Sequence, residues 1–184
     1  MTKRLAAALA AALLLPAAAG AQTMEFECPV PGTTFVYDNG TRVTAKGREG
    51  MDCLMQVEGG KPYKLRALLF DNPAPDGRDM TAYIDALKPE RLWPLEIGRK
   101  IEARYSAGGR TWHYTLSVPR QDKRTGPGGA LVEVFLVEMI EQAEKGGRSL
   151  SRYWISPKDR FVIAFDFTDG EGKATRARVT EITK

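Results

Sequence analysis

Histidine and cysteine are scarce in this sequence, which contains one His and two Cys in 184 residues. A metal centre with several histidines is therefore excluded, and any histidine-dependent nucleophilic mechanism would have to use His113. The sequence also has no glycine-rich phosphate-binding loop leading into a helix, and no nucleophile elbow. These absences leave no catalytic residue to name, and we predict neither a metal ion nor a cofactor.

Long hydrophobic runs are absent except at the N-terminus. Lys3 and Arg4 precede an Ala- and Leu-rich stretch from Leu5 to Ala19, and Ala19-Gly20-Ala21 supplies the small residues of a cleavage site. This order is typical of a secretory signal peptide, and the run is too short for a membrane-spanning helix. We predict cleavage near Ala21, a periplasmic or secreted location, and a mature chain that does not span the membrane.

An excess of charge of one sign is also nearly absent from the mature chain. Without Lys3 and Arg4 it has 25 basic and 23 acidic residues, a net charge of +2. So weak an excess does not indicate a nucleic-acid partner. The remaining 163 residues are enough for one domain with a hydrophobic core, and no linker divides them. We therefore expect residues 1–21 to be a signal peptide and residues 22–184 to be a single β-rich domain.

The two cysteines, Cys28 and Cys53, both lie near the mature N-terminus. In an oxidising compartment an isolated pair is most simply a disulfide, which would stabilise the fold by roughly 3–4 kcal/mol in the chain-entropy model. A redox or metal pair is the alternative. The spacing is not Cys-x-x-Cys, and no histidine lies near either residue. We predict a structural disulfide.

Short β-strands separated by turn signals dominate the mature sequence. Asp38-Asn39-Gly40 is a hairpin turn, and in the segment 110–118 apolar and polar residues alternate. Ten strands are expected, at 33–37, 41–46, 52–58, 63–70, 98–105, 110–118, 131–140, 148–155, 161–167 and 175–183. Sheets of this size curl, close or form two layers. The predicted fold class is mainly β, an antiparallel open barrel or sandwich of about nine or ten strands with one short helix.

The one convincing helical pattern follows a proline-rich break. Met80, Tyr83, Ile84 and Leu87 recur with the spacing of one helix face, and Asp79 precedes them as a candidate N-cap. Pro89 would end the helix.

The segment from Arg120 to Gly129 is predicted to be a polar, basic loop. Its cations Arg120, Lys123 and Arg124 are candidate contacts for an anionic envelope component or another envelope protein. An ordinary solvated surface is the alternative for the same residues.

Aromatic residues on the expected strands suggest a second kind of site. If the barrel is hollow, then Trp112, Tyr114, Phe135 and Trp154 would line a cavity for an apolar ligand such as a lipid. If it is not, the same side chains simply fill the core.

Acidic residues are numerous but scattered. The segment Asp166 to Gly172 lacks the ligand spacing of a calcium loop, and Asp71, Asp76 and Asp79 lie in or beside a proline-containing loop. A carboxylate-dependent hydrolase would need two acids within about 10 Å of each other in a cleft. The leading hypothesis is a non-catalytic binding or interaction module of the cell envelope. The alternatives are an apolar-ligand carrier and such a hydrolase.

One segment carries a resemblance to known proteins. Tyr153-Trp154-Ile155-Ser156-Pro157, followed by Phe161-Val162, is similar to a tight hairpin of exported bacterial β proteins. With Pro94-Leu95 and Gly98 opening an earlier strand, it resembles uncharacterised secreted proteobacterial β-rich domains. More distantly it resembles the open barrels of periplasmic lipoprotein carriers. The resemblance spans residues 92–167 and rests on turn residues, so it implies a fold and no functional residue.

Overall fold

The computed structural model describes residues 23–184, so the predicted signal peptide lies outside the described residues. The helical segments are α1 (Thr81–Leu87), η1 (Pro89–Leu92) and η2 (Pro127–Gly129). The strands are β1 (Thr23–Met24), β2 (Thr34–Tyr37), β3 (Arg42–Glu49), β4 (Asp52–Val57), β5 (Pro62–Arg66), β6 (Phe70–Asn72), β7 (Leu95–Glu96), β8 (Lys100–Ala107), β9 (Arg110–Thr125), β10 (Leu131–Ala143), β11 (Arg148–Ser156), β12 (Phe161–Thr168) and β13 (Ala174–Thr183).

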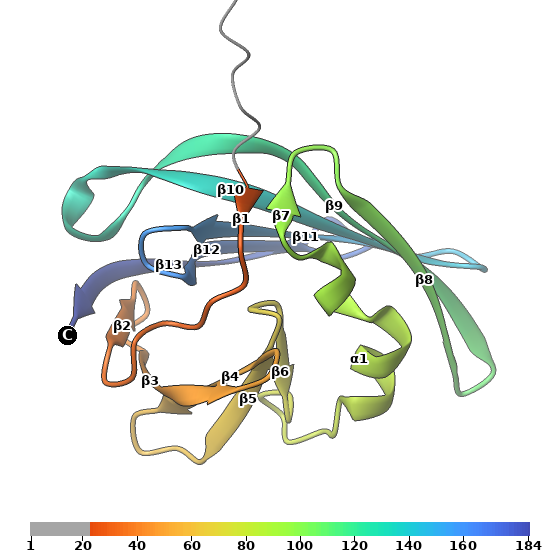
Figure 1. The fold of residues 1–184 in the computed structure, drawn as a ribbon. Helices are drawn as coiled ribbons and strands as arrows, with labels where there is room; N and C mark the ends of the chain where they lie inside the picture. Colours follow the sequence, from red (N-terminus) through yellow and green to blue (C-terminus); the bar gives the residue numbers. More distant parts are fainter. Residues whose placement is uncertain (1–22) are drawn as a thin grey trace, which may run out of the picture.

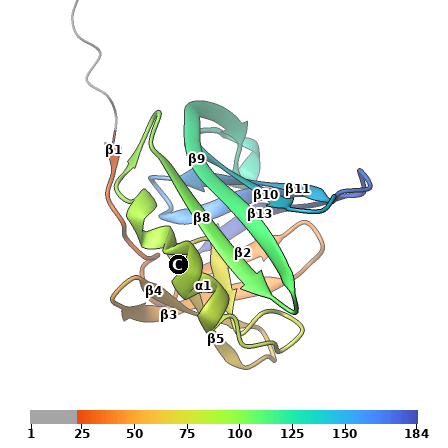
Figure 2. The same cartoon turned by 90° about the vertical axis from the view of Figure 1, so that its right-hand side faces the viewer.

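Eleven of these strands form one antiparallel sheet, in the order β6-β5-β4-β3-β2-β13-β12-β11-β10-β9-β8. The sheet curls without closing, because its two edge strands, β6 and β8, do not pair with each other (Figure 1). Helix α1 lies in the gap between these edges and packs against β8 (Figure 2). β1 and β7 form a separate two-stranded sheet. For residues 23–184 the predicted fold class is confirmed as mainly β, antiparallel and open, with one short α-helix.

The strand count exceeds the prediction because three strands are very short. β1, β6 and β7 have two or three residues each, too few for an alternating pattern. The expected strand 63–70 is in fact a hairpin, in which β5 ends at Arg66 and β6 begins at Phe70. The chain turns at Ala67 and Leu68, which have φ values of 53° and 61°. Neither residue is Gly, Asn or Asp, so this turn has no signal in the sequence.

Helix α1 follows the predicted apolar pattern, with Ile84 and Leu87 buried. The structure places Met80, rather than Asp79, at the N-cap position. Asp79 still satisfies the first turn, because its Oδ1 accepts hydrogen bonds from the backbone N–H and the hydroxyl of Thr81, at 2.9 and 2.7 Å. The prediction of Asp79 as the N-cap is therefore wrong by one position, although its side chain bonds to the first residue of the helix.

The curled sheet has an N-terminal half, strands β2 to β6, and a C-terminal half, strands β8 to β13, and the hydrophobic core is continuous across both. Phe35 of β2 stacks on Phe161 of β12 with ring centroids 3.9 Å apart, which joins the halves at the centre. Burying aromatic rings of this size contributes several kcal/mol in such cores. The predicted disulfide is present: Cys28 and Cys53, with Cα atoms 5.4 Å apart, attach the N-terminal segment to β4.

The β9–β10 hairpin bends back over the sheet. β9 extends to Thr125, so the expected basic loop is mostly strand and only the tip at Gly126–Ala130 is irregular. A bulge between Leu136 and Glu138 disrupts the pairing opposite Pro119, a residue that sheets tolerate mainly at bulges and edges. The tip, η2, packs against β13, three strands away from β10 (Figure 1).

Candidate functional site

The four aromatic residues predicted to line one cavity do not come together. Trp112, Tyr114 and Phe135 lie on the inner face of the sheet, at register positions that share one parity. Trp154 lies on the outer face, because its neighbour Tyr153 occupies the inner one. Tyr114 and Phe135 belong to the packed core, with 2% and 1% of their surface exposed. The apolar-ligand site, as the sequence placed it, is therefore not assembled in this structure.

Trp154 is instead covered by Arg124, which comes from the bent end of the β9–β10 hairpin. The guanidinium carbon of Arg124 lies 3.7 Å from the centroid of the Trp154 ring. Within residues 23–184 the Nε of Arg124 and the Nε1 of Trp154 are buried without a hydrogen-bond partner. The Arg124 side chain therefore covers the Trp154 ring and makes a cation–π contact with it.

The other two predicted cations, Arg120 and Lys123, are exposed. An Nη2 of Arg120 lies 3.6 Å from an oxygen of Asp122, and Lys123 stands opposite Glu133 in the β9–β10 register. Of the three candidate contact residues, Arg124 therefore stacks on an aromatic ring, whereas Arg120 and Lys123 each have an acidic residue beside them. Their role toward an anionic partner stays a prediction.

A pocket of about 330 Å³ opens at the end of the curled sheet, between the β4–β5 turn and the loop that follows β6. We call it the mouth pocket. It is lined by Val57, Gly60, Lys61, Pro62, Tyr63, Asp71, Pro73, Ala74, Pro75 and Gly77. Tyr63 and Asp71 share the inner face of the sheet with the buried Leu65, because Asp71 stands opposite Leu65 in the β5–β6 register. The walls are mostly apolar, and the pocket has one carboxyl group.

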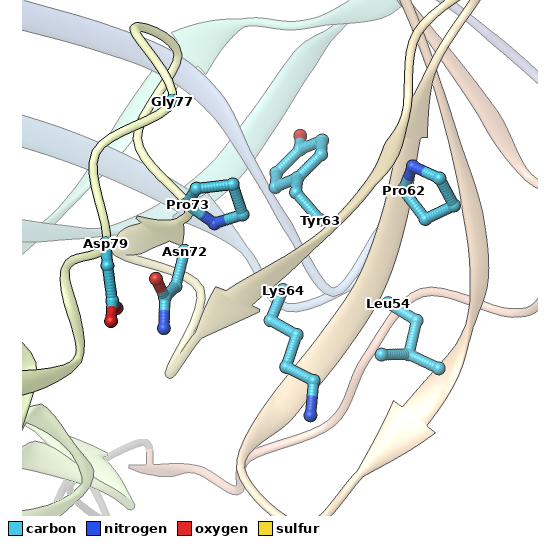
Figure 3. Close-up of a pocket in the computed structure, with 8 residues that line it drawn as sticks. All are labelled: Leu54, Pro62, Tyr63, Lys64, Asn72, Pro73, Gly77 and Asp79. Carbon is cyan, nitrogen blue, oxygen red and sulfur yellow. The ribbon is translucent and has the colours of Figure 1, made fainter.

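A second hollow, of about 520 Å³, lies on the other side of the same strands. In Figure 3 the Tyr63 ring projects to one side of β5, while Lys64 and Leu54 lie on the other. The polar groups of this outer hollow already have partners: Lys64 Nζ lies 2.7 Å from Glu49, and the Asn72 amide bonds to the Thr81 hydroxyl at 3.1 Å. The outer hollow is therefore a groove between side chains that are already paired.

Asp71 of the mouth pocket has an unusual environment. Burial raises the pKa of its carboxyl to about 6. The charge of Asp71 acts on three tyrosines from separate strands: Tyr37 of β2, Tyr63 of β5 and Tyr153 of β11. Burial, and secondarily the charge of Asp71, raises the pKa of each of these phenols. Among the described residues, no Lys, Arg or His forms a salt bridge with Asp71.

A second, partly buried carboxyl, that of Glu141 in β10, belongs to the same inner face. It stands opposite Tyr114 and Ser149 in the register of the neighbouring strands. Burial raises its pKa, and hydrogen bonds from the hydroxyls of Tyr114 and Ser149 oppose that rise. The charges of Asp71 and Glu141 both act on the hydroxyl of Tyr153. The inner face thus carries two carboxyl groups, those of Asp71 and Glu141.

Aromatic rings in contact continue this inner surface across the gap in the sheet. Tyr83 of α1 lies with its ring centroid 5.8 Å from Phe70, 5.4 Å from Tyr105 and 5.4 Å from Tyr114. Tyr105 in turn stacks with Trp112 at 6.4 Å. Edge-to-face contacts of this kind hold the rings in fixed orientations. Through Tyr83 the helix thereby connects the aromatic residues of β6, β8 and β9 across the gap in the sheet.

The acids that the sequence grouped with Asp71 do not converge on it. Asp76 is exposed and pairs with Arg78 at 2.6 Å, and Asp79 bonds to the start of α1. In the part of the chain that the structure describes, no group of three or more His, Cys, Asp and Glu residues is placed to hold a metal ion. His113, the single histidine, lies 3.5 Å from Glu144 as a half-exposed surface pair.

Asp71 was not recognised from the sequence as a pocket residue. It belongs to a strand of three residues and follows a turn without signal residues, so nothing in its neighbourhood marks it as inward-facing. An acidic residue directly after the apolar run Ala67–Phe70 is the single available hint.

Comparisons with known proteins add little to this picture. No protein-family model matches the chain, and a search of curated proteins found no match. A solved structure, that of the hypothetical lipoprotein YmcC from Escherichia coli K12, is similar with a TM-score of 0.46 and 12% identity. The similarity covers 86% of this chain and 89% of that one, and it says nothing about function. No helix within residues 23–184 is long and apolar enough to cross a membrane.

Proposed function

We propose that residues 22–184 form one domain of a non-catalytic binding protein of the cell envelope, and that its ligand enters the mouth pocket. The Cys28–Cys53 disulfide supports an oxidising, extracytoplasmic location, as does the predicted signal peptide. The position of the pocket supports a binding role, because open ends of curled sheets are common places for ligands.

The observation that carries the proposal is the contrast between Asp71 and other covered acids of the chain. Asp52 pairs with Arg66, and Glu138 pairs with Arg152 at 2.8 Å. Asp71 forms no salt bridge with any described residue, and the cation that lines its pocket, Lys61, is exposed in the β4–β5 turn. Ionising a covered carboxyl without a paired cation costs stability. Such a cost is typical of a group whose partner arrives with a ligand.

An apolar passenger remains compatible with this proposal if it occupies the mouth rather than the interior. The inner residues predicted to enclose it are packed, whereas the mouth pocket offers three prolines and a tyrosine ring as apolar surface. We therefore place the ligand at the mouth for either kind of molecule.

A carboxylate-dependent hydrolase is the second candidate, favoured by the presence of Asp71 and Glu141 on the same inner face of the sheet. It would cleave envelope glycans, and both Asp71→Asn and Glu141→Gln would abolish the cleavage. Absence of cleavage by the mature wild-type protein would eliminate it and leave the binding role.

The test is a thermal-shift and native mass spectrometry experiment on mature protein with fractionated envelope extract. Ala74→Trp fills the mouth pocket, and Ala130→Trp is the matched control, since Ala130 is exposed at the hairpin tip far along the chain from the pocket. We expect wild type and Ala130→Trp to bind a component that Ala74→Trp does not. Equal binding by all three proteins, or binding by none, would contradict the proposal.

A further inference from the structure

We propose that the mouth pocket binds a small organic cation, an ammonium group carried on a ring or a short apolar body. The inference rests on the proposed function, since it assumes that this pocket is the ligand site, and it adds the chemical class of the ligand. Three features of the pocket carry it: the sign of its charge, the chemistry of its walls and its size.

The charge that faces the pocket interior is negative. Asp71 contributes its carboxylate, and its charge acts on three phenols of the packed strands, Tyr63, which lines the pocket, and Tyr37 and Tyr153. Because burial keeps these phenols protonated, none of them offsets the carboxylate. The cation that lines the pocket is Lys61, an exposed residue in the β4–β5 turn that forms no salt bridge with Asp71. The Asp71 carboxylate would therefore repel an anionic ligand, whereas it would serve as the counter-ion of a cationic one.

The walls suit a cation that also has apolar surface. Pro62, Pro73 and Pro75 give the lining aliphatic rings, and Tyr63 adds an aromatic ring to the same pocket as Asp71. Aromatic faces attract ammonium groups, most strongly where water is displaced. A strongly hydrated inorganic ion would lack oxygen ligands here, because Asp71 is the single carboxyl that lines the pocket.

The size of the pocket limits the ligand. A volume of about 330 Å³ lies at the lower end of small-molecule sites, which hold compounds of one or two rings. A complete lipid would not fit, although an amine-bearing headgroup of the same chemistry would.

The contrast with Asp52 argues against a purely structural role for Asp71. Both residues lie on strands of the same half of the sheet, and both are largely covered. Asp52 accepts two hydrogen bonds from the guanidinium of Arg66, which neutralises it within the fold. Asp71 has no such cation, so an ammonium ligand would supply the interaction that Arg66 supplies to Asp52.

The test is an NMR titration of the mature protein with three soluble probes of similar size: benzyltrimethylammonium, benzyl alcohol and benzoate. We expect the cation to shift the backbone amides of residues 60–63 and 71–77, the alcohol to bind at least about tenfold more weakly, and benzoate to leave these amides unchanged. Because the quaternary probe does not titrate, its affinity should follow the ionisation of Asp71. It should fall about tenfold from pH 7.5 to pH 5 for a carboxyl with a pKa of about 6.

Two variants assign the effect to Asp71. Asp71→Asn should weaken binding of the cation at pH 7.5 by about tenfold or more and remove the pH dependence. Asp76→Asn, in the loop that follows β6, changes an exposed acid that pairs with Arg78 and should bind as wild type does. A phosphocholine-bearing micelle would test the lipid-headgroup source. Shifts of the same amides with the micelle would extend the ligand to a headgroup, and their absence would restrict it to free small molecules.

The outcomes separate this inference from the proposed function. If cation and alcohol bind the mouth equally, with no effect of Asp71→Asn, the cationic class is wrong and the binding site stands. If no probe shifts the mouth amides, the cation proposal is overturned. The extract experiment with Ala74→Trp then decides whether the pocket binds anything.

Discussion

Two regions of the molecule each cover a charged side chain, and they do so in opposite ways. On the outer face of the sheet Arg124 lies flat on Trp154, 3.7 Å from the ring centroid, at the end of a hairpin bent over its own sheet. In the mouth pocket Asp71 lies with Tyr63 and mostly apolar residues, and none of the salt bridges of the described residues includes it. The first charge has found a permanent partner within the fold, and the second has not.

The difference indicates which covered charge stabilises the fold and which is available to a ligand. Placing a guanidinium on an aromatic face retains favourable electrostatics while its aliphatic stem covers apolar surface. Ionising a carboxyl among apolar walls is unfavourable until a counter-ion arrives. We therefore expect substitutions in the first region to destabilise the protein and removal of the charge in the second to stabilise it.

The largest expected effect comes from Trp154→Ala. The Trp154 side chain is 2% exposed, so its removal leaves a cavity under the bent hairpin and should lower the free energy of unfolding by about 3–5 kcal/mol. Urea denaturation of the mature protein measures this change. Trp154→Phe, which retains a ring below Arg124, is the matched control and should cost clearly less. A loss below about 1 kcal/mol for Trp154→Ala would mean that the hairpin does not pack on the sheet in solution.

Asp71→Asn should act in the opposite direction. Folding raises the pKa of Asp71 from 3.8 to about 6, so its contribution to stability is fully present below the unfolded value and is lost as the pH rises through about 6. At pH 7 the variant should therefore be more stable than wild type, by up to about 3 kcal/mol, and the gain should disappear near pH 4.

Unfolding curves of both proteins from pH 4 to pH 7.5 measure this difference. Asp76→Asn is again the matched control, because Asp76 is exposed, and it should show no such pH-dependent gain. Destabilisation at pH 7 by Asp71→Asn would show that Asp71 is a structural residue like Arg124, which would remove the contrast between the regions.

Arg124→Met should have an intermediate effect. Methionine retains an unbranched apolar chain over the ring but removes the cation, so we expect a loss of about 1–2 kcal/mol. Lys123→Met, one position away on the exposed side of the same strand, should change stability by less than about 0.5 kcal/mol. Equal effects at the two positions would show that the stack contributes no more than a surface cation does.

The smallest effect on stability is expected for the double variant Arg120→Glu/Lys123→Glu. Both side chains are exposed, so the free energy of unfolding should stay within about 0.5 kcal/mol of wild type. If an anionic envelope component binds this face, co-sedimentation with envelope fractions should fall in the double variant. Sedimentation equal to that of wild type would reject the basic-surface hypothesis, and Arg124 is left unchanged here because its substitution would also perturb the fold.

Much of the architecture was predictable from local patterns. The alternation in β9, the turn signals at Gly40 and Gly146, and the helical spacing of Ile84 and Leu87 all correspond to observed elements. The Cys28–Cys53 bond followed from the cysteine count. These features depend on residues close together in the chain, or on so few candidates that one pairing remains.

The candidate site was not predictable in the same way. The charge of Asp71 acts on Tyr37 and Tyr153, which lie 34 and 82 positions away in the sequence. A local sequence pattern cannot predict an interaction between residues so far apart. The turn of the β5–β6 hairpin could not be predicted from the sequence, because Ala67 and Leu68 adopt positive φ although neither is glycine. The strength of tertiary packing, with both residues buried, outweighs their local preference.

The sequence by itself determined the strand-rich class, the short helix and the disulfide, because periodicity, turn chemistry and composition act over a few residues. Only the tertiary structure decided which faces of the strands meet and which charges are paired. The bend opposite Pro119 brings Arg124 onto Trp154, and the curl of the open sheet surrounds Asp71 with tyrosines from three strands. The physical reason is that burial and electrostatic pairing depend on distances in space, which the order of residues along the chain does not state.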